Sequence, residues 1–419
     1  MKILWITNIL FPYPLKQLNM PPMVVGGWLY SLLSILQQQE EFEFAVASIY
    51  PGKELMEMED NGVKYYLIPG KQPLKYEKTM EQYWKQINEK FSPDLVHIHG
   101  TEYTHGLAFV NACPEVKTVT SIQGLISEIE KVYYANIPLK EIVKNITLRD
   151  IIKFDNLIDQ KRKYHKRSQY EKGLIQKTDA IIGRTTWDYA NTKRMCLQEK
   201  YYSCNEILRD SFYENQWNIE KIERHTIFCC QGTYPIKGLH YMIEALYLLK
   251  NYYADAKLYV AGSNITDISD WYHKLKQTGY AKYLRKLIEK YKLKDSIIFT
   301  GSLSEEEMLQ RLLKTNVFVL PSAIENSSNS LSEAMILGLP CIASNTGGTM
   351  DMLEYPKEGL LYPYTEPAIL AEYVMQYFRD DDLCIKLGQA ARTRALKRHN
   401  KQAIGGKMIQ IYKEMNDHK

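Results

Sequence analysis

Short apolar runs alternate with longer amphipathic stretches along the whole chain. The short runs predict buried strands. The apolar residues spaced three and four apart between them, as in Leu239–Lys250 and Glu305–Lys314, predict helices. This alternation is typical of βαβ units and parallel sheets. The predicted strands are Lys2–Thr7, Phe42–Ile49, Val63–Ile68, Leu95–His99, Thr118–Ile122 and Ala180–Gly183 in the first half, and Thr226–Cys230, Lys257–Ala261, Ser296–Thr300, Asn316–Leu320, Pro340–Ser344 and Gly359–Tyr362 in the second.

The length of 419 residues predicts two domains of about 200 residues each. A polar, weakly periodic segment, 201–224, is the predicted interdomain linker, so that the first domain covers 1–200 and the second 225–399. Both are expected to be doubly wound α/β domains. Ligands bind such sheets at the strand ends, and two domains facing each other would enclose a cleft. The first half also contains a lysine-rich helical region without a predicted strand, Glu128–Lys177.

Composition narrows the class of protein. The chain is 45% hydrophobic and 24% charged, a soluble globular balance, and its net charge of +4 is too small to indicate a nucleic-acid partner. Seven scattered cysteines without a C-x-x-C pair argue against a disulfide framework or a zinc knuckle and favour a cytoplasmic location. The apolar start predicts a buried strand rather than a signal peptide, because Pro12 and Pro14 interrupt it. No apolar run approaches the roughly 18 residues that span a membrane.

The segment Pro321–Gly348 carries the most informative polar pattern. Glu325 lies in a loop after an apolar strand, and Glu333 lies in the first turn of a helix expected to begin near Ser330. A helix N-terminus favours a bound anion such as a diphosphate, and the two carboxylates could accept hydrogen bonds from sugar hydroxyls on either side. Ser330-x-x-Glu333 is equally a capping box, in which the glutamate only satisfies the helix end. Both interpretations stay open at this point.

The same segment resembles the C-terminal signature of glycosyltransferase family 4, in which two glutamates separated by seven residues bracket the donor. The resemblance extends to a Gly-Gly turn and to four other segments, which are Gly347-Gly348, GSLSEEEM at Gly301–Met308, EGLLYP at Glu358–Pro363, DLVHIHG at Asp94–Gly100 and Gly26-Gly27. It implies a GT-B fold, in which two Rossmann-like domains face a central cleft and the last helix, near 400–419, packs back on the first domain. The first domain would bind the acceptor, and the second would bind the nucleotide sugar. It also implies a retaining glycosyltransferase that moves a sugar from a nucleoside-diphosphate sugar to a saccharide or lipid-linked acceptor. Family members commonly act in cell-surface polysaccharide or glycolipid assembly.

The resemblance also assigns residue roles. Glu325 would contact the donor sugar, Glu333 the nucleotide ribose, and Lys237 would neutralise the leaving diphosphate. The other positions that it places at the donor are Gly26, Gly27, Ser302, Asn329, Ser330 and Leu331. No metal is expected, because the sequence has no convincing ligand cluster. No other cofactor is expected either, since the nucleotide sugar is a substrate.

Two departures from the family pattern concern the same site. The family has an arginine a few residues before the lysine, but 231–236 contains none, and Arg184 and Arg209 are the candidate replacements. The family histidine at the end of the strand in SIQGL is replaced by Gln123. His97 and His99 lie on one side of the neighbouring predicted strand. One of them is expected to face the cleft, and at least one to be an ordinary core histidine.

Two further motifs and two other functions remain as alternatives. Asp380–Asp382 could hold a metal, but its place between two predicted helices favours helix capping. The basic run Lys161–Arg167 is typical of a solvated helix face, and its alternative is contact with anionic lipid headgroups at the inner membrane face. The chain could also be a nucleotide-sugar epimerase, which needs no acceptor, or a non-catalytic nucleotide-sugar-binding protein.

Overall fold

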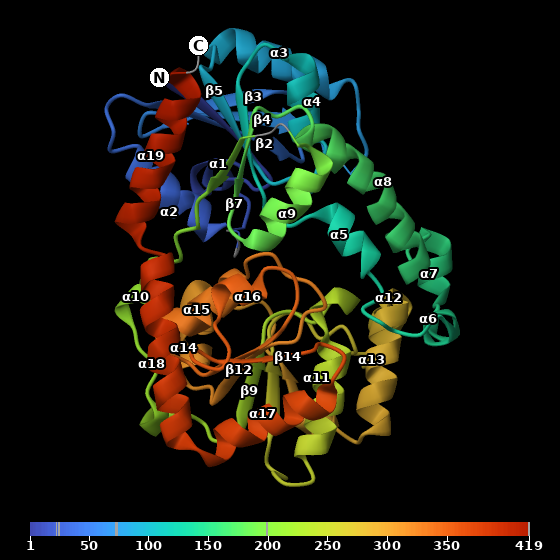
Figure 1. The fold of residues 1–419 in the computed structure, drawn as a ribbon. Coiled ribbons are helices and arrows are strands. Elements are labelled where there is room, and N and C mark those ends of the chain that lie inside the picture. The colour runs from blue at the N-terminus through green and yellow to red at the C-terminus, as the bar shows by residue number, and fades with distance from the viewer. Residues whose placement is uncertain (22, 24–25, 72–73, 198–199, 418–419) are drawn as a thin grey trace. The chain divides into compact units, whose positions relative to one another are not determined.

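The computed structural model describes residues 1–419 except 22, 24–25, 72–73, 198–199 and 418–419. The chain forms two compact units, and each contains one predominantly parallel sheet covered by helices (Figure 1). Unit 1 comprises Met1–Glu128, Tyr164–Ile207 and His399–Lys419, and unit 2 comprises Ile129–Lys163 and Leu208–Arg398. The two units are described separately below.

The sheet of unit 1 has eight strands in the order β3-β4-β2-β1-β5-β6-β7-β8. All neighbours are parallel except β3 and β4. Its strands are β1 (Lys2–Thr7), β2 (Glu43–Tyr50), β3 (Met56–Asp60), β4 (Val63–Pro69), β5 (Leu95–His99), β6 (Thr118–Ser121), β7 (Ala180–Gly183) and β8 (Lys200–Ser203). Its helices are α1 (Pro12–Gln17), α2 (Gly27–Leu36), α3 (Met80–Phe91), α4 (His105–Ala112), α9 (Thr186–Met195) and α19 (Lys401–Asp417), while α5 (Ile126–Lys131) and α8 (Leu157–Ile175) continue into unit 2.

Strand β1 shows why the sheet of unit 1 has helices on both faces. Successive side chains of a strand point to opposite faces. Ile3 and Trp5 therefore pack in one core with α2 and α19, and Leu4 and Ile6 in a second core with α3 and α4. The Trp5 indole also donates a hydrogen bond of 3.0 Å to the Tyr412 hydroxyl on α19. The C-terminal helix α19, red in Figure 1, thus belongs to unit 1 and lies beside α2.

The sheet of unit 2 has six parallel strands in the order β11-β10-β9-β12-β13-β14. The strands are β9 (Thr226–Cys229), β10 (Lys257–Val260), β11 (Ile297–Phe299), β12 (Val317–Leu320), β13 (Cys341–Ser344) and β14 (Leu360–Tyr362). The helices are α6 (Leu139–Asn145), α7 (Leu148–Lys153), α10 (Asp210–Glu214), α11 (Leu239–Leu249), α12 (Trp271–Lys276), α13 (Gly279–Lys290), α14 (Glu305–Leu313), α15 (Asn329–Leu337), α16 (Thr349–Met352), α17 (Pro367–Arg379) and α18 (Asp381–Arg398), with short 3-10 helices η1 (Ile219–Lys221), η2 (Pro235–Lys237) and η3 (Lys294–Ser296). The chain order reverses between β9 and β12, which makes their carboxyl ends the topological switch point.

The boundary between the two units, after Ile207, lies inside the predicted linker 201–224, but this segment is not a separate linker. Its start completes strand β8, and the segment from Leu208 onward is part of unit 2. The Trp217 backbone amide donates to the Leu337 carbonyl at 2.8 Å, and its indole donates to the Thr315 carbonyl at 2.8 Å. Single large aromatic side chains, such as the fully buried Phe212, anchor this segment, and isolated anchors leave no periodic pattern in the sequence.

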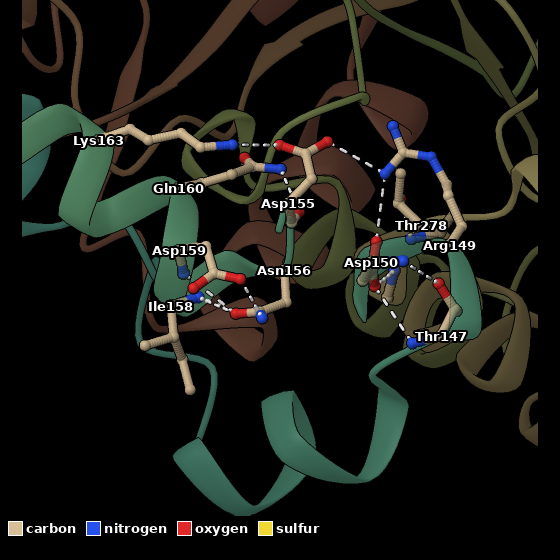
Figure 2. A network of polar contacts seen from close by, with 12 residues as sticks. Thr147, Arg149, Asp150, Asp155, Asn156, Ile158, Asp159, Gln160, Lys163 and Thr278 are labelled. Carbon is tan, nitrogen blue, oxygen red and sulfur yellow. Dashed lines mark hydrogen bonds and ion pairs between the residues drawn. The ribbon is translucent and has the colours of Figure 1, made fainter. Parts of the chain in front are cut away.

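Residues 129–163, here called the arm, also correct the predicted domain boundary, because they belong to unit 2 and not to a first domain of 1–200. One carboxylate oxygen of Asp150 accepts a 2.8 Å hydrogen bond from the Gly279 amide at the start of α13 (Figure 2). The Ala135 carbonyl accepts hydrogen bonds of 3.2 Å from the His240 ring and the Tyr241 hydroxyl. The arm is helical, as predicted, but contacts with residues more than a hundred positions away decide which sheet it covers.

Candidate active site

Lys237 and Glu325 meet at the switch point of unit 2. Lys237 ends η2, which follows β9, and Glu325 lies in the loop after β12, the neighbouring strand. The Lys237 ammonium lies 2.6 Å from a Glu325 carboxylate oxygen. The Ser322 hydroxyl donates to the same oxygen at 2.8 Å. Both site residues predicted to carry the chemistry are therefore in direct contact.

Close backbone packing brings the two loops together. Gly238, next to Lys237, has a positive φ of 71°, and a Cβ atom there would lie 1.8 Å from the Pro321 carbonyl oxygen. The Ala323 amide donates to the Ile236 carbonyl at 2.7 Å. Only glycine allows this approach without displacing backbone, so the sequence Lys-Gly is what lets the lysine loop contact the glutamate loop.

The Gly-Gly turn predicted from the resemblance packs against the backbone of Glu325. Gly347 has a φ of 56°, and a Cβ atom there would lie 1.9 Å from the Glu325 carbonyl oxygen. The Gly348 amide donates to that same oxygen at 2.9 Å. The turn thus fixes the backbone that carries the Glu325 carboxylate.

Glu333 does not cap its helix, so the capping-box interpretation is wrong. Helix α15 begins at Asn329, and the Ser328 hydroxyl caps it by accepting from the Leu331 amide at 3.3 Å. Glu333 is one turn further into the helix, where no backbone amide needs a cap. The cap therefore comes from a serine two residues earlier than the sequence pattern suggested.

The Glu333 carboxylate is held instead by Arg209. The guanidinium donates two hydrogen bonds of 2.8 Å, one to each carboxylate oxygen. Only 17% of the Arg209 side chain and 9% of the Glu333 side chain are exposed. Burial raises the pKa of Glu333, while the hydrogen bonds and charge of Arg209 oppose that rise. Arg209, one of the two candidate replacements for the family arginine, thus orients Glu333.

The other predicted donor positions lie at the ends of neighbouring elements of unit 2. Asn329, Ser330 and Leu331 form the first turn of α15, and the Ser330 hydroxyl lies 3.0 Å from the Ser328 hydroxyl. Ser302 is exposed just after β11, next to Gly301, which bridges to Gly262. Their roles as donor contacts stay predictions.

Comparison with known proteins finds a family model that covers the segment carrying this site. Residues 212–394, which include Lys237, Glu325 and Glu333, match the family model described as glycosyl transferases group 1. This segment of the chain is similar to the group 1 glycosyltransferases. It is 24% identical over 379 residues to YtcC of Bacillus subtilis, named as a glycosyltransferase, a match that covers 88% of this chain and 84% of that one. It is also 25% identical over 177 residues to a GDP-mannose-dependent alpha-(1-6)-phosphatidylinositol monomannoside mannosyltransferase of Mycobacterium tuberculosis, covering 41% and 42% of the two chains.

The fold of the chain matches solved structures along its whole length. Sucrose-phosphate synthase from Thermosynechococcus elongatus superposes with a TM-score of 0.75 at 16% identity, and the match covers 100% of both chains. The predicted fold class, a GT-B fold with two Rossmann-like doubly wound units, is confirmed. The narrower assignment to family 4 and the central cleft stay predictions.

Unit 1 of the glycosyltransferase holds the remaining candidate residues around a small cavity of about 20 Å³. The Gln123 amide donates to one Glu206 carboxylate oxygen at 2.8 Å, and Arg184 lies 2.7 Å from the other. Arg184 also donates to the carbonyls of Ile122 and Gln123. Glu206, which no sequence pattern indicated, contacts both Gln123 and Arg184.

The two histidines on β5 differ, although they share one side of the strand. The His97 ring nitrogens lie 2.6 Å from the Tyr412 hydroxyl and 2.6 Å from the Ser121 hydroxyl, so His97 is the expected core histidine. Both rings line the cavity, but within the described part of the chain neither ring nitrogen of His99 has a hydrogen-bond partner. Burial lowers its pKa well below the usual value, so the ring is neutral.

The glycine pair of unit 1 stands at the start of a helix, as predicted. Gly26 has a φ of 93°, and α2 begins at Gly27. A Cβ atom on Gly26 would lie 1.8 Å from the Ile9 side chain. A contact of these glycines with the donor stays a prediction.

The acidic and basic motifs have structural partners. Asp380 accepts a 2.8 Å hydrogen bond from the Leu383 amide, which confirms helix capping, and Asp381 pairs with Arg224. No group of three His, Cys, Asp or Glu side chains suited to a metal occurs among the described residues.

In the basic run, Lys161 pairs with Glu130, Arg162 with Asp159 and Lys163 with Asp155. No helix in the described ranges is long and apolar enough to cross a membrane.

A larger cavity, of about 610 Å³, borders the Lys237 loop within unit 2. Residues of the arm, of the loop before Lys237 and of the start of α13 line it. Two buried polar atoms of its lining, the Gln277 amide nitrogen and the Thr233 hydroxyl, have no hydrogen-bond partner among the residues described. Buried polar atoms of this kind can pair with a water molecule or with a polar ligand.

Proposed function

We propose that this chain transfers a sugar from a nucleoside-diphosphate sugar to a saccharide or lipid-linked acceptor and retains the anomeric configuration. The contact between Lys237 and Glu325 at the switch point, together with a buried Glu333 on the helix that follows, carries the proposal. This is where ligands bind in open α/β sheets. The N-terminus of α15 adds backbone amides that favour a phosphate group.

Each of the three charged residues has a separate role in the proposal. Lys237 neutralises the diphosphate, on which negative charge builds as it departs. Glu325 accepts hydrogen bonds from hydroxyls of the donor sugar, and its contact with the lysine supports adjacent sites for the sugar and the diphosphate. Glu333, oriented by two hydrogen bonds from Arg209, accepts from the ribose hydroxyls.

The proposed step needs no protein base. The bond from the anomeric carbon to the diphosphate oxygen breaks, and both electrons leave with that oxygen. The acceptor hydroxyl oxygen forms a bond to the anomeric carbon on the same face, and its proton passes to the departing diphosphate oxygen. Attack on the face that the leaving group vacates keeps the configuration.

The proposed acceptor classes and biological setting are based on the similarity of this chain to named glycosyltransferases. The mannosyltransferase relative is named as dependent on GDP-mannose and as acting on a phosphatidylinositol mannoside. A nucleotide-sugar donor and a glycolipid acceptor are therefore reasonable for this chain, in the assembly of cell-surface polysaccharide or glycolipid. We assign acceptor sugar hydroxyls to the cavity beside the Lys237 loop, where Gln277 and Thr233 supply unpaired polar atoms.

A thermal-shift screen of nucleoside diphosphates and nucleotide sugars tests the donor, because a ligand that binds the folded state raises Tm. The best donor is then incubated with saccharide and lipid-linked acceptors, and proton NMR of the product reports its anomeric configuration. Inversion of configuration would refute retention. Turnover of the donor to an epimer without acceptor would support the epimerase alternative instead.

Matched variants separate the donor and acceptor roles. Glu333→Gln should weaken nucleotide binding, whereas Gln277→Leu should raise the acceptor KM and leave nucleotide affinity unchanged. Because Gln277→Leu replaces a buried unpaired amide by an apolar group of similar size, it should not lower Tm. Gln389→Leu, at an exposed position on α18, serves as the control.

A further inference from the structure

The arm and the neighbouring α12 segment carry nearly half of the exposed large hydrophobic side chains of the described chain. We call this the arm surface, and its apolar members are Leu139, Val143, Leu148, Ile151, Ile152, Phe154, Ile268, Trp271, Tyr272 and Leu275. Helix α7 contacts α12, so these residues form one region of unit 2. Contiguous exposed apolar groups of this kind mark interaction sites.

Helix α7 exposes its apolar face, whereas an ordinary surface helix buries it. Leu148, Ile151 and Ile152 are three and four residues apart, so they share one face, and that face is exposed. The opposite face is polar, and its buried Asp150 caps α7 through Thr147 and binds the start of α13 (Figure 2). The polar contacts therefore attach the helix to unit 2 and leave its apolar face outward.

Phe154 is unusual in both its backbone conformation and its exposure to solvent. It ends α7 with a positive φ of 49°, a conformation that a bulky side chain rarely adopts, and 73% of its surface is exposed. Neither the backbone nor the core of unit 2 gains from a phenylalanine here. A residue that is unfavourable for the fold in both respects indicates a functional contact outside the chain.

The charged side chains of the arm surface indicate which kind of partner binds there. An exposed acid before α12, Asp270, caps that helix and pairs with His273. The exposed charged side chains of α6, α7 and α12 themselves are lysines, namely Lys140, Lys144, Lys153, Lys274 and Lys276. Burial lowers the pKa of Lys286 behind them, and the charges of Lys282 and Lys144 lower it further. Apolar and aromatic side chains interspersed with lysines are typical of helices that lie in the interface of an anionic membrane.

We propose that the arm surface binds the anionic face of a lipid bilayer, with the apolar side chains of α7 inserted and the lysines at the headgroups. This deepens the proposed function, on whose lipid-linked acceptor it rests, because it holds the enzyme where such an acceptor resides. A second copy of the chain fits less well, since a two-fold interface would bring these lysines against each other.

Vesicle binding tests the proposal with the full chain and without any nucleotide. The protein is sedimented with vesicles of phosphatidylcholine and with vesicles that also contain phosphatidylglycerol. The double variant Ile152→Gln with Phe154→Asn should bind the anionic vesicles about 100-fold more weakly. Lys140→Gln with Lys144→Gln should remove most of the preference for phosphatidylglycerol. The control Leu197→Gln removes an isolated exposed leucine of unit 1 and should change neither result.

Stability separates this interpretation from a folding defect. Phe154→Asn places a residue that tolerates positive φ at an exposed position, so Tm should stay equal or rise while vesicle binding falls. Unchanged vesicle binding by the double variant would overturn the proposal. So would absent vesicle binding together with dimerisation that the same variant abolishes, which would identify a second copy as the occupant. Because donor binding is measured separately, failure here leaves the proposed transfer reaction standing.

Discussion

Substitution of Arg209 tests the site directly, because it should leave the buried Glu333 carboxylate without its ion-pair partner. In Arg209→Met, Glu333 keeps its burial but loses both 2.8 Å hydrogen bonds and the opposing charge. Removing one partner of a buried ion pair costs about 3–5 kcal/mol. The exposed pair of Arg224 with Asp381 is the matched control in the same unit, since its side chains are 48% and 43% exposed and Arg224→Met should cost less than about 1 kcal/mol.

The stability loss of Arg209→Met should grow as the pH rises. Burial already raises the pKa of Glu333, and without Arg209 nothing opposes that rise. A carboxyl group whose pKa is higher in the folded state than in the unfolded state favours folding while protonated, and this contribution is lost as pH rises through the folded pKa. Arg209→Met should therefore be most destabilised at alkaline pH. The double variant Arg209→Met with Glu333→Gln should recover much of the stability, because no charge then remains buried.

Urea unfolding followed by tryptophan fluorescence gives the free energy of unfolding, and hydrogen exchange of the α15 amides reports the opening of this helix alone. The wild-type chain, the two single arginine variants and the double variant are compared at several pH values. If Arg209→Met costs no more than Arg224→Met, or if its cost does not change with pH, the buried pair does not hold Glu333 and the reasoning fails.

Three further predictions concern catalysis and pH. Lys237→Ala should lower turnover about 100- to 1000-fold while circular dichroism shows a folded protein; retention of more than about a tenth of the activity would mean that another cation holds the diphosphate. Transfer should persist in EDTA and in Asp380→Ala, measured as product formed per enzyme, and a strict need for manganese or magnesium would contradict it. Burial raises the pKa of Glu102 from 4.5 to about 7, so its carboxylate destabilises unit 1 as pH rises. Glu102→Gln should accordingly raise Tm more at about pH 8 than at about pH 5, and an equal gain at both would count against the shift.

The strands of both sheets could be predicted almost to the residue. Every predicted strand is present, and its ends differ by at most one residue. Strands buried on both faces are continuous apolar runs, which need no partner to be recognised. The two strands that the sequence did not indicate are both outermost in the sheet, β3 with alternating acids and β8 with a single buried side chain.

The central part of the candidate site was also visible in the sequence, whereas its supporting contacts were not. Lys237, Glu325 and the turn at Gly347 lie in short motifs whose meaning depends on strand–loop–helix order, and that order is local. The partner of Glu333 is 124 positions away in the chain, and the local pattern around Ser330 suggested a cap instead. Sequence spacing can identify a serine and a glutamate three residues apart, but it cannot show that a serine two residues earlier begins the helix.

The sequence by itself determined the elements, the parallel sheets and the chemical character of the loop after β12, because hydrophobic period, glycine positions and short motifs act over a few residues. Only the tertiary structure decided that the arm joins unit 2, that Arg209 reaches Glu333 and that Glu206 gathers Gln123 and Arg184. These are pairings between side chains far apart in the chain. Their free energy depends on which groups become buried together, and burial is a property of the assembled units rather than of any single segment.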